Sequence, residues 1–189
     1  MDWSGKTFNA AAPNDDRNLS SRYSNASISF EDNSMDKQQH AIHLGGLVGN
    51  LQSLEIAIRL ALAQLPGSPA KDTYGDDFRN AKVGTLVPVS DLSSFASLRE
   101  LIKVFNEKLS PNPPLDLALV TLRDAIAHGR VFAGPDEEEF RVVKFEKPQR
   151  GATQVAVEYS AVMTEAWFME NKAWVRDAIE TVDRAWGKL

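Results

Sequence analysis

Hydrophobic residues recur about every 3.6 positions in one long segment, which predicts an amphipathic helix over roughly residues 37–65. Pro66-Gly67-Ser68-Pro69 ends it, because proline cannot continue a helix. Gly45 and Gly49 would leave a bare strip that another helix can approach closely; alternatively, regular helix begins only near Leu47. The apolar stripe consists of Leu44, Leu47, Val48, Leu51, Leu54, Ile58, Ala61, Leu62 and Leu65.

The same pattern predicts further helices. One is expected over residues 91–109, capped by Ser90-Asp91, and another over 114–128, with proline at its start and Gly129 just past its end. A long final helix is expected over about 163–186, capped by Thr164 or Ser160. A short helix near 74–81 is also predicted. The final helix carries a buried stripe that includes Trp167, Trp174, Val175, Ala178, Val182 and Trp186.

Two segments before the final helix resemble strands. Phe140–Glu146 and Thr153–Tyr159 are rich in β-branched and aromatic residues, and a turn-forming segment joins them, so we expect a β-hairpin. Residues 1–35 are polar and predict a loosely ordered arm, with one short strand at Ile28–Phe30. The expected fold is therefore mainly α: residues 36–189 form a small helical bundle with a β-hairpin inserted before the long C-terminal helix.

Composition narrows the possible functions. The chain has 189 residues, 43% of them hydrophobic, which is enough for one core. Its net charge of −5 argues against binding nucleic acid through a global field, although a local basic cleft is compatible with it. The absence of cysteine excludes thiolate chemistry and cysteine-ligated metals. There is no membrane-length apolar run and no secretory pattern, so we expect a cytoplasmic protein without a membrane partner.

The 114–128 helix combines two faces. Leu115, Leu119, Leu122 and Ile126 form its core face on a helical wheel. Asp124 and His128 lie i,i+4 on nearly the opposite side, which also bears Leu117, Val120 and Ala127. A water-facing helix has little use for leucine and valine there, so we expect another helix or a second subunit to cover that face.

The chemistry of this helix suits a phosphodiester. The His128 imidazole can move a proton at neutral pH, Asp124 can orient the ring, and Arg123 and Arg130 can stabilise charge on phosphate oxygens. For RNA, the simplest reaction is attack by the 2′-hydroxyl on the adjacent phosphorus, with one histidine as base and a second, from a partner subunit, as acid. This reaction needs neither a metal ion nor an organic cofactor, and we expect none.

The segment Arg123-Asp124-Ala125-Ile126-Ala127-His128-Gly129-Arg130 resembles the R-x4–6-H motif of the HEPN superfamily. The resemblance implies a helical domain over roughly residues 40–186 and, for catalytic members, a metal-independent endoribonuclease that works as a homodimer in toxin–antitoxin or antiviral systems. Arg123, Asp124 and His128 then take the motif positions. Asp124 stands where asparagine is commoner, which leaves its tuning of the site open.

Other residues allow more than one interpretation. Glu55 lies on the apolar stripe and could support Arg123, or it could pair with Arg59 at i,i+4. His40 and His43 could share a metal ion, but a polar first turn explains them better. The segment around the hairpin is locally basic and could guide RNA towards His128, or be simply solvated. Its candidate RNA-binding residues are Arg130, Arg141, Lys144, Lys147 and Arg150.

Two rival functions remain compatible with the same residues. The first is a non-catalytic helical module of bacterial or phage origin that uses the His128 face for dimerisation or partner binding, whereas an antitoxin protein would be a partner of the ribonuclease. The second is a regulatory domain that binds a nucleotide, although Gly45-Gly46-Leu47-Val48-Gly49 has neither a preceding strand nor a lysine. Ribonuclease chemistry remains the leading hypothesis.

Overall fold

The computed structural model describes residues 35–68, 80–87, 89–134 and 140–188. The expectations for the N-terminal arm, the Ile28–Phe30 strand and most of the 74–81 helix lie outside them. One compact unit spans Ser34–Leu189. In chain order its elements are α1 (Lys37–Ala63), α3 (Leu98–Leu109), α4 (Ala118–His128), β1 (Arg130–Ala133), β2 (Phe140–Phe145), β3 (Val157–Val162) and α5 (Glu165–Trp186). The fold is mainly helical, as predicted.

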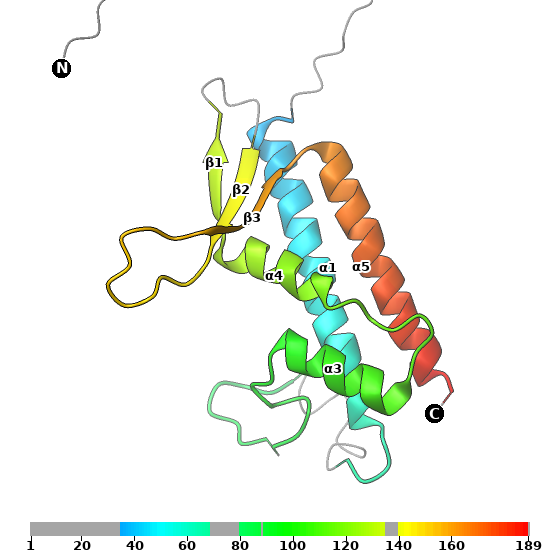
Figure 1. Ribbon diagram of the computed structural model, residues 1–189. Coiled ribbons are helices and arrows are strands. Elements are labelled where there is room, and N and C mark those ends of the chain that lie inside the picture. The colour runs from blue at the N-terminus through cyan, green and yellow to red at the C-terminus, as the bar shows by residue number, and fades with distance from the viewer. Residues whose placement is uncertain (1–34, 69–79, 88, 135–139, 189) are drawn as a thin grey trace, which may run out of the picture. The chain divides into compact units, whose positions relative to one another are not determined.

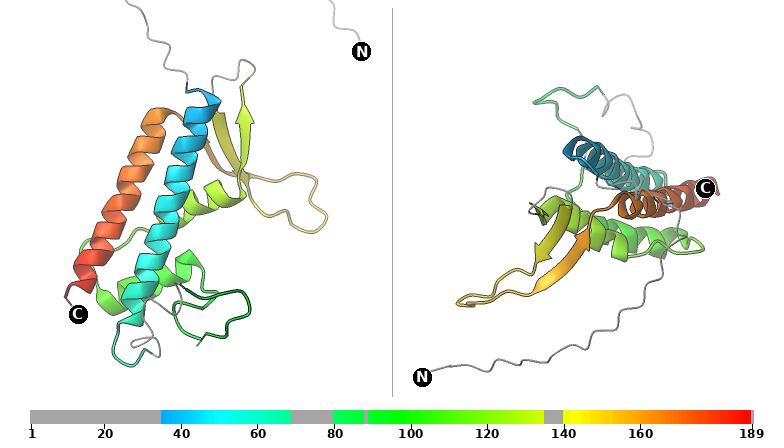
Figure 2. Two further views of the ribbon diagram at one scale, coloured as in Figure 1. Left: turned by 180° about the vertical axis from the view of Figure 1, so that it is seen from behind. Right: turned by 90° about the horizontal axis from the view of Figure 1, so that it is seen from above.

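The long helices α1 and α5 lie side by side and run in the same direction (Figures 1 and 2). A capping box starts α1: the Asp36 carboxylate accepts from the Gln39 backbone N–H at 2.7 Å, and Gln39 accepts in return. The helix is therefore regular from Lys37 onward, including its glycines. Nothing lies within 4 Å of a Cβ built at Gly45 or Gly49, so no other helix occupies that strip within the described unit.

The sequence places the start of α3 too early. The cap is Ser97, whose hydroxyl accepts from the Glu100 N–H, while Glu100 accepts from the Ser97 N–H at 2.7 Å. The hydrogen bonds that the Ser97 N–H and hydroxyl donate to the Glu100 carboxylate also lower the pKa of Glu100. Ser90 and Asp91 instead lie in the preceding loop. A competing cap seven residues further on thus decides where the helix begins.

The start of α4 is also later than expected. The Asn106 side chain donates to the Leu115 carbonyl at 2.8 Å and accepts from the Leu115 N–H at 2.9 Å. These bonds hold Leu115 outside the helix, and Asp116 then accepts from the Ala118 N–H at 2.8 Å. The predicted cap of α5 is confirmed, because Thr164 Oγ1 accepts from the Trp167 N–H at 3.1 Å.

The predicted hairpin is part of a three-stranded antiparallel sheet in the order β1-β2-β3. The sequence analysis missed β1, and β3 begins later than the expected Thr153. Val131 and Ala161 flank Val142 on either side in the register, and Val142 is only 1% exposed. The sheet therefore has one face towards the helices, centred on Val142.

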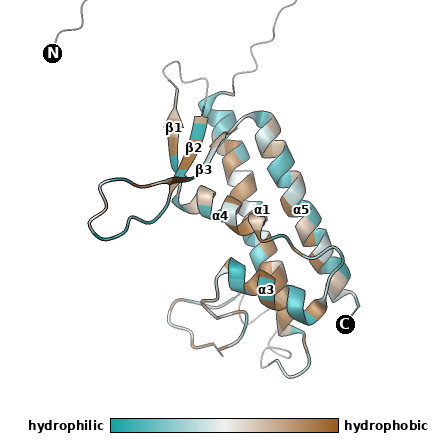
Figure 3. Cartoon of the chain, in the orientation of Figure 1, coloured by the Kyte–Doolittle hydropathy of each residue, from teal (hydrophilic) through white to brown (hydrophobic). Residues whose placement is uncertain are grey.

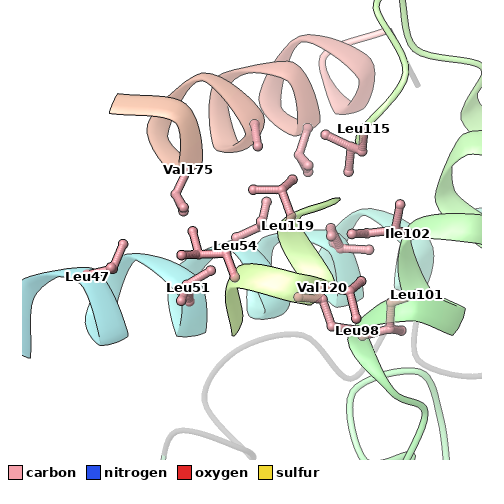
Figure 4. Close-up of a cluster of buried hydrophobic side chains, with 14 of the residues drawn as sticks. Leu47, Leu51, Leu54, Leu98, Leu101, Ile102, Leu115, Leu119, Val120 and Val175 are labelled. Carbon is pink, nitrogen blue, oxygen red and sulfur yellow. The ribbon is translucent and has the colours of Figure 1, made fainter. Parts of the chain in front are cut away.

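The core collects the apolar stripes of the helices with Val142 and Met163 from the sheet region. Figure 3 shows hydrophobic and hydrophilic segments alternating along α3 and α5, as expected for amphipathic helices. The tryptophans predicted for the core pack against it while only partly buried. Figure 4 shows part of this cluster, including Leu47, Leu51, Leu54, Leu98, Leu101, Ile102, Leu115, Leu119, Val120 and Val175. No helix among the described residues has the length and apolar character needed to traverse a bilayer.

Candidate functional site

Helix α4 packs in the core on one side, and the candidate residues lie on its other sides. Leu119, Leu122 and Ala125 are buried in the core, while His128 is exposed at the last helical position. The side chains of Arg123 and Asp124 are 40% and 31% exposed. The core face of the helix thus orients a set of half-buried and exposed polar groups on its other sides.

Arg123 connects the three motif residues. Its Nη1 donates to Asp124 Oδ1 at 3.2 Å and lies 3.5 Å from His128 Nε2. The sequence predicts Asp124 beside the ring, whereas the group beside Nε2 is the Arg123 guanidinium. Because arginine only donates, this contact is a hydrogen bond only in the tautomer whose Nε2 carries no proton. The arrangement places one guanidinium and one imidazole together at the end of a helix.

Gly129 leaves the helical conformation directly after α4, and a side chain does not fit at this position. A Cβ at this position would collide with the Ala125 carbonyl oxygen and come within 2.8 Å of Val142 Cγ2. The backbone of Gly129 therefore packs directly against β2, and β1 begins at the next residue, Arg130. The predicted helix stop is confirmed, and it also joins His128 closely to the sheet.

A groove of about 490 Å³ lies beside this cluster, between α1, α4 and the loop that precedes α3. Arg123, Ile126 and Ala127 form its α4 side. Most of the remaining wall is apolar, with Gln52, Glu55 and Arg59 as its other polar residues. The groove therefore combines an apolar lining with a guanidinium that also contacts the candidate imidazole.

Glu55 pairs with Arg59, which is the second of the two roles that the sequence allows. Its Oε1 accepts from Arg59 Nη2 at 2.9 Å and from Nε at 3.3 Å. Arg59 is only 8% exposed and also donates to the carbonyl oxygens of Asp91, Ser94 and Ala96 at 2.8–3.1 Å. Sequence reasoning missed this contact with the loop. The pair thereby fixes the loop that forms one side of the groove.

The face of α4 that bears Asp124 and His128 is covered at one end only. Val120 is buried and belongs to the same core cluster as Leu98 and Leu101 of α3 (Figure 4). Ala127 and His128, about two turns further along, are exposed. The core therefore accounts for Val120, whereas Leu117 at the start of the face is 36% exposed and the end with the imidazole stays open.

The five basic candidates do not form one cluster. Lys144 is 2.7 Å from Glu158 Oε2 in an ion pair. Lys147 and Arg150 are exposed in the connection between β2 and β3. Arg130 lies over the Phe145 ring, with Cζ 5.3 Å from its centroid, and Arg141 Nη1 is 3.4 Å from Ser160 Oγ. Arg130 and Arg141 thus contact other residues of the sheet, whereas Lys144 forms an ion pair with Glu158.

His40 is buried rather than part of a solvated first turn, which corrects the sequence-based interpretation. Its ring stacks on Phe140, with centroids 4.2 Å apart, and meets the Phe168 ring edge-on at 5.5 Å. Burial lowers the pKa of His40, and nearby His43 lowers it further. His43 Nδ1 lies 3.3 Å from the Lys172 ammonium. The two histidines therefore help to pack α1 against β2 and α5.

Comparison with known proteins returned no matching family model, no matching curated protein and no matching solved structure.

Proposed function

We propose that this chain is a metal-independent endoribonuclease of the HEPN type that acts as a homodimer. The observation that carries the proposal is the arrangement of Arg123, whose guanidinium lies between Asp124 Oδ1 and His128 Nε2 at the edge of the groove. An imidazole that can move a proton and a guanidinium that can stabilise phosphate charge are two of the groups that can catalyse cleavage of a phosphodiester.

In the proposed reaction the 2′-hydroxyl of RNA attacks the adjacent phosphorus, and the bond to the 5′-oxygen breaks. His128 of one protomer, as the neutral imidazole, takes the 2′-hydroxyl proton, and the partner subunit's His128, as the imidazolium, gives its proton to the leaving oxygen. Arg123 stabilises the charge that builds up on the non-bridging phosphate oxygens, and Asp124 holds Arg123 in place. The products are a 2′,3′-cyclic phosphate and a 5′-hydroxyl.

The test is cleavage of RNA by the purified protein in excess EDTA. Total RNA and a set of defined single-stranded oligonucleotides serve as substrates, each paired with a 2′-O-methyl copy. We expect cleavage of the ribose forms, resistance of the 2′-O-methyl forms, and cyclic phosphate termini identified by mass spectrometry. Cleavage that stops in EDTA, or that cuts 2′-O-methyl RNA, contradicts the mechanism. An intact dimer that cuts none of these RNAs favours the non-catalytic interaction module instead.

The homodimer can be tested separately from the chemistry, and we place its interface at the groove. Ile56 is 47% exposed and lies in the groove wall that includes Arg123. An aspartate in an apolar interface loses hydration without gaining a partner. We therefore expect Ile56→Asp to convert the dimer into a monomer in analytical ultracentrifugation and to lower RNA cleavage at least tenfold.

The matched control is Ile42→Asp. Ile42 is 64% exposed and lies on the same helix, about 21 Å from Ile56 along its axis. We expect this variant to remain dimeric and active. A wild-type monomer that cleaves RNA, or equal loss of association in both variants, would show that the groove is not the dimer interface.

A further inference from the structure

The sheet has a second face that points away from the buried Val142. Side chains alternate between the two faces of a strand, so Arg141 and Val143 on β2 lie opposite to Val142. The register pairs Arg130 with Val143 and Phe132 with Arg141, which puts both β1 residues on this second face. We use the term outer sheet face for Arg130, Phe132, Arg141, Val143, Phe145, Ser160 and Val162.

This face combines exposed aromatic surface with positive charge. The Phe132 side chain is 50% exposed, directly across from Arg141. Arg130 stacks over Phe145 at 5.3 Å, which independently places Phe145 on the same face. These seven positions include two arginines and no carboxylate, although the chain as a whole has a net charge of −5. Figure 3 shows hydrophobic residues along β1, the edge strand.

An exposed ring next to guanidinium groups fits a single-stranded nucleic acid. A base stacks on an aromatic ring, and arginine binds the flanking phosphates. A duplex does not fit equally well, because its bases are already stacked on one another. The face also begins close to the candidate site along the chain, because Arg130 follows His128 by only two residues.

We propose that the outer sheet face is a stacking platform for single-stranded RNA, with Phe132 as the base-stacking residue and Arg130 as a phosphate-binding residue. The inference rests on the proposed function, since it names the substrate class of the same site: an unpaired strand that crosses the sheet and reaches His128 at the end of α4.

The test measures binding separately from cleavage. Fluorescence anisotropy follows a labelled 2′-O-methyl single strand of mixed sequence, with the full chain as its partner. We expect Phe132→Ala to weaken binding about tenfold, the effect of losing one stacked base. Phe132→Tyr, which keeps the ring, is expected to stay within about twofold of wild type. Arg130→Ala is expected to reduce the slope of log K against log salt concentration by about 0.7, the value for one phosphate contact on a single strand.

The matched control is Val131→Ala on the other face of β1. Val131 is 47% exposed, almost the same as Phe132, so both substitutions trim a half-exposed side chain from an edge strand. We expect Val131→Ala to bind like wild type. Equal weakening by both substitutions, or unchanged binding by Phe132→Ala, overturns the proposal. So does a change from dimer to monomer in Phe132→Ala, which would make the face a protein interface.

The readouts also separate this inference from the proposed function. A wild-type protein that cuts no RNA but binds the single strand through Phe132 would contradict the nuclease and leave the platform intact. Cleavage that proceeds normally in Phe132→Ala, together with unchanged binding, would contradict the platform and leave the nuclease intact.

Discussion

Replacing His128 by alanine is expected to lower RNA cleavage by at least about 100-fold, because a positioned acid–base group typically contributes 10²–10⁴. His128 is exposed at the last position of α4, so its removal leaves the core unchanged. Binding of a non-cleavable single strand should therefore persist. Cleavage rates under single-turnover conditions and binding by anisotropy measure the two effects separately.

His43→Ala controls for the loss of an imidazole. His43 lies next to the Lys172 ammonium and is not one of the residues proposed for cleavage. The variant should therefore cleave RNA at close to the wild-type rate. An Arg123→Lys variant adds a second check, since lysine keeps the charge but lacks the planar guanidinium whose Nη1 contacts both Asp124 and His128. An active His128→Ala protein would refute the proposed acid–base role.

The Arg59→Met variant is expected to lose about 3 kcal/mol of unfolding free energy, because removing a buried charged donor strands its partners. Arg59 is 8% exposed and donates to three carbonyl oxygens of the 91–96 loop as well as to Glu55. Methionine matches the aliphatic stem but makes none of these bonds. Urea unfolding at neutral pH measures the loss.

Arg176→Met is the matched control, because Arg176 is exposed on α5 and its replacement should change stability by less than about 0.5 kcal/mol. Arg59→Lys should recover only part of the loss, since one ammonium cannot reach all the acceptors that the guanidinium fork serves. A loss below about 1 kcal/mol in Arg59→Met would mean that water replaces the guanidinium at these carbonyls.

Local signals in the sequence were enough for the long helices. The periodic stripe, the Pro66 stop and the Thr164 cap all act within a few residues, so α1 and α5 were predicted nearly to their ends. The α3 boundary was also readable, since Ser97-Leu98-Arg99-Glu100 has the spacing of a capping box. Ser90-Asp91 and Ser97 are both plausible caps, and the structure uses Ser97, whose capping box satisfies the N–H groups of both Ser97 and Glu100.

Other features depend on contacts between distant segments. The four residues of β1 are too short to show alternation, and they are strand only because β2 pairs with them. Arg59 reaches a loop 32 to 37 residues away, which no local spacing indicates. The motif residues were found from spacing alone, but the position of Arg123 between Asp124 and His128 depends on side-chain geometry.

The direct packing of Gly129 on Val142 also sets which residues of β1 point outward. Strand β1 starts immediately after this contact, so the end of α4 fixes its register against β2. A one-residue insertion or deletion between His128 and Arg130 would turn every side chain of β1 to the opposite face. Val131 would then be presented outward and Arg130 and Phe132 inward. The number of residues between His128 and Arg130 therefore determines which β1 side chains the outer sheet face presents.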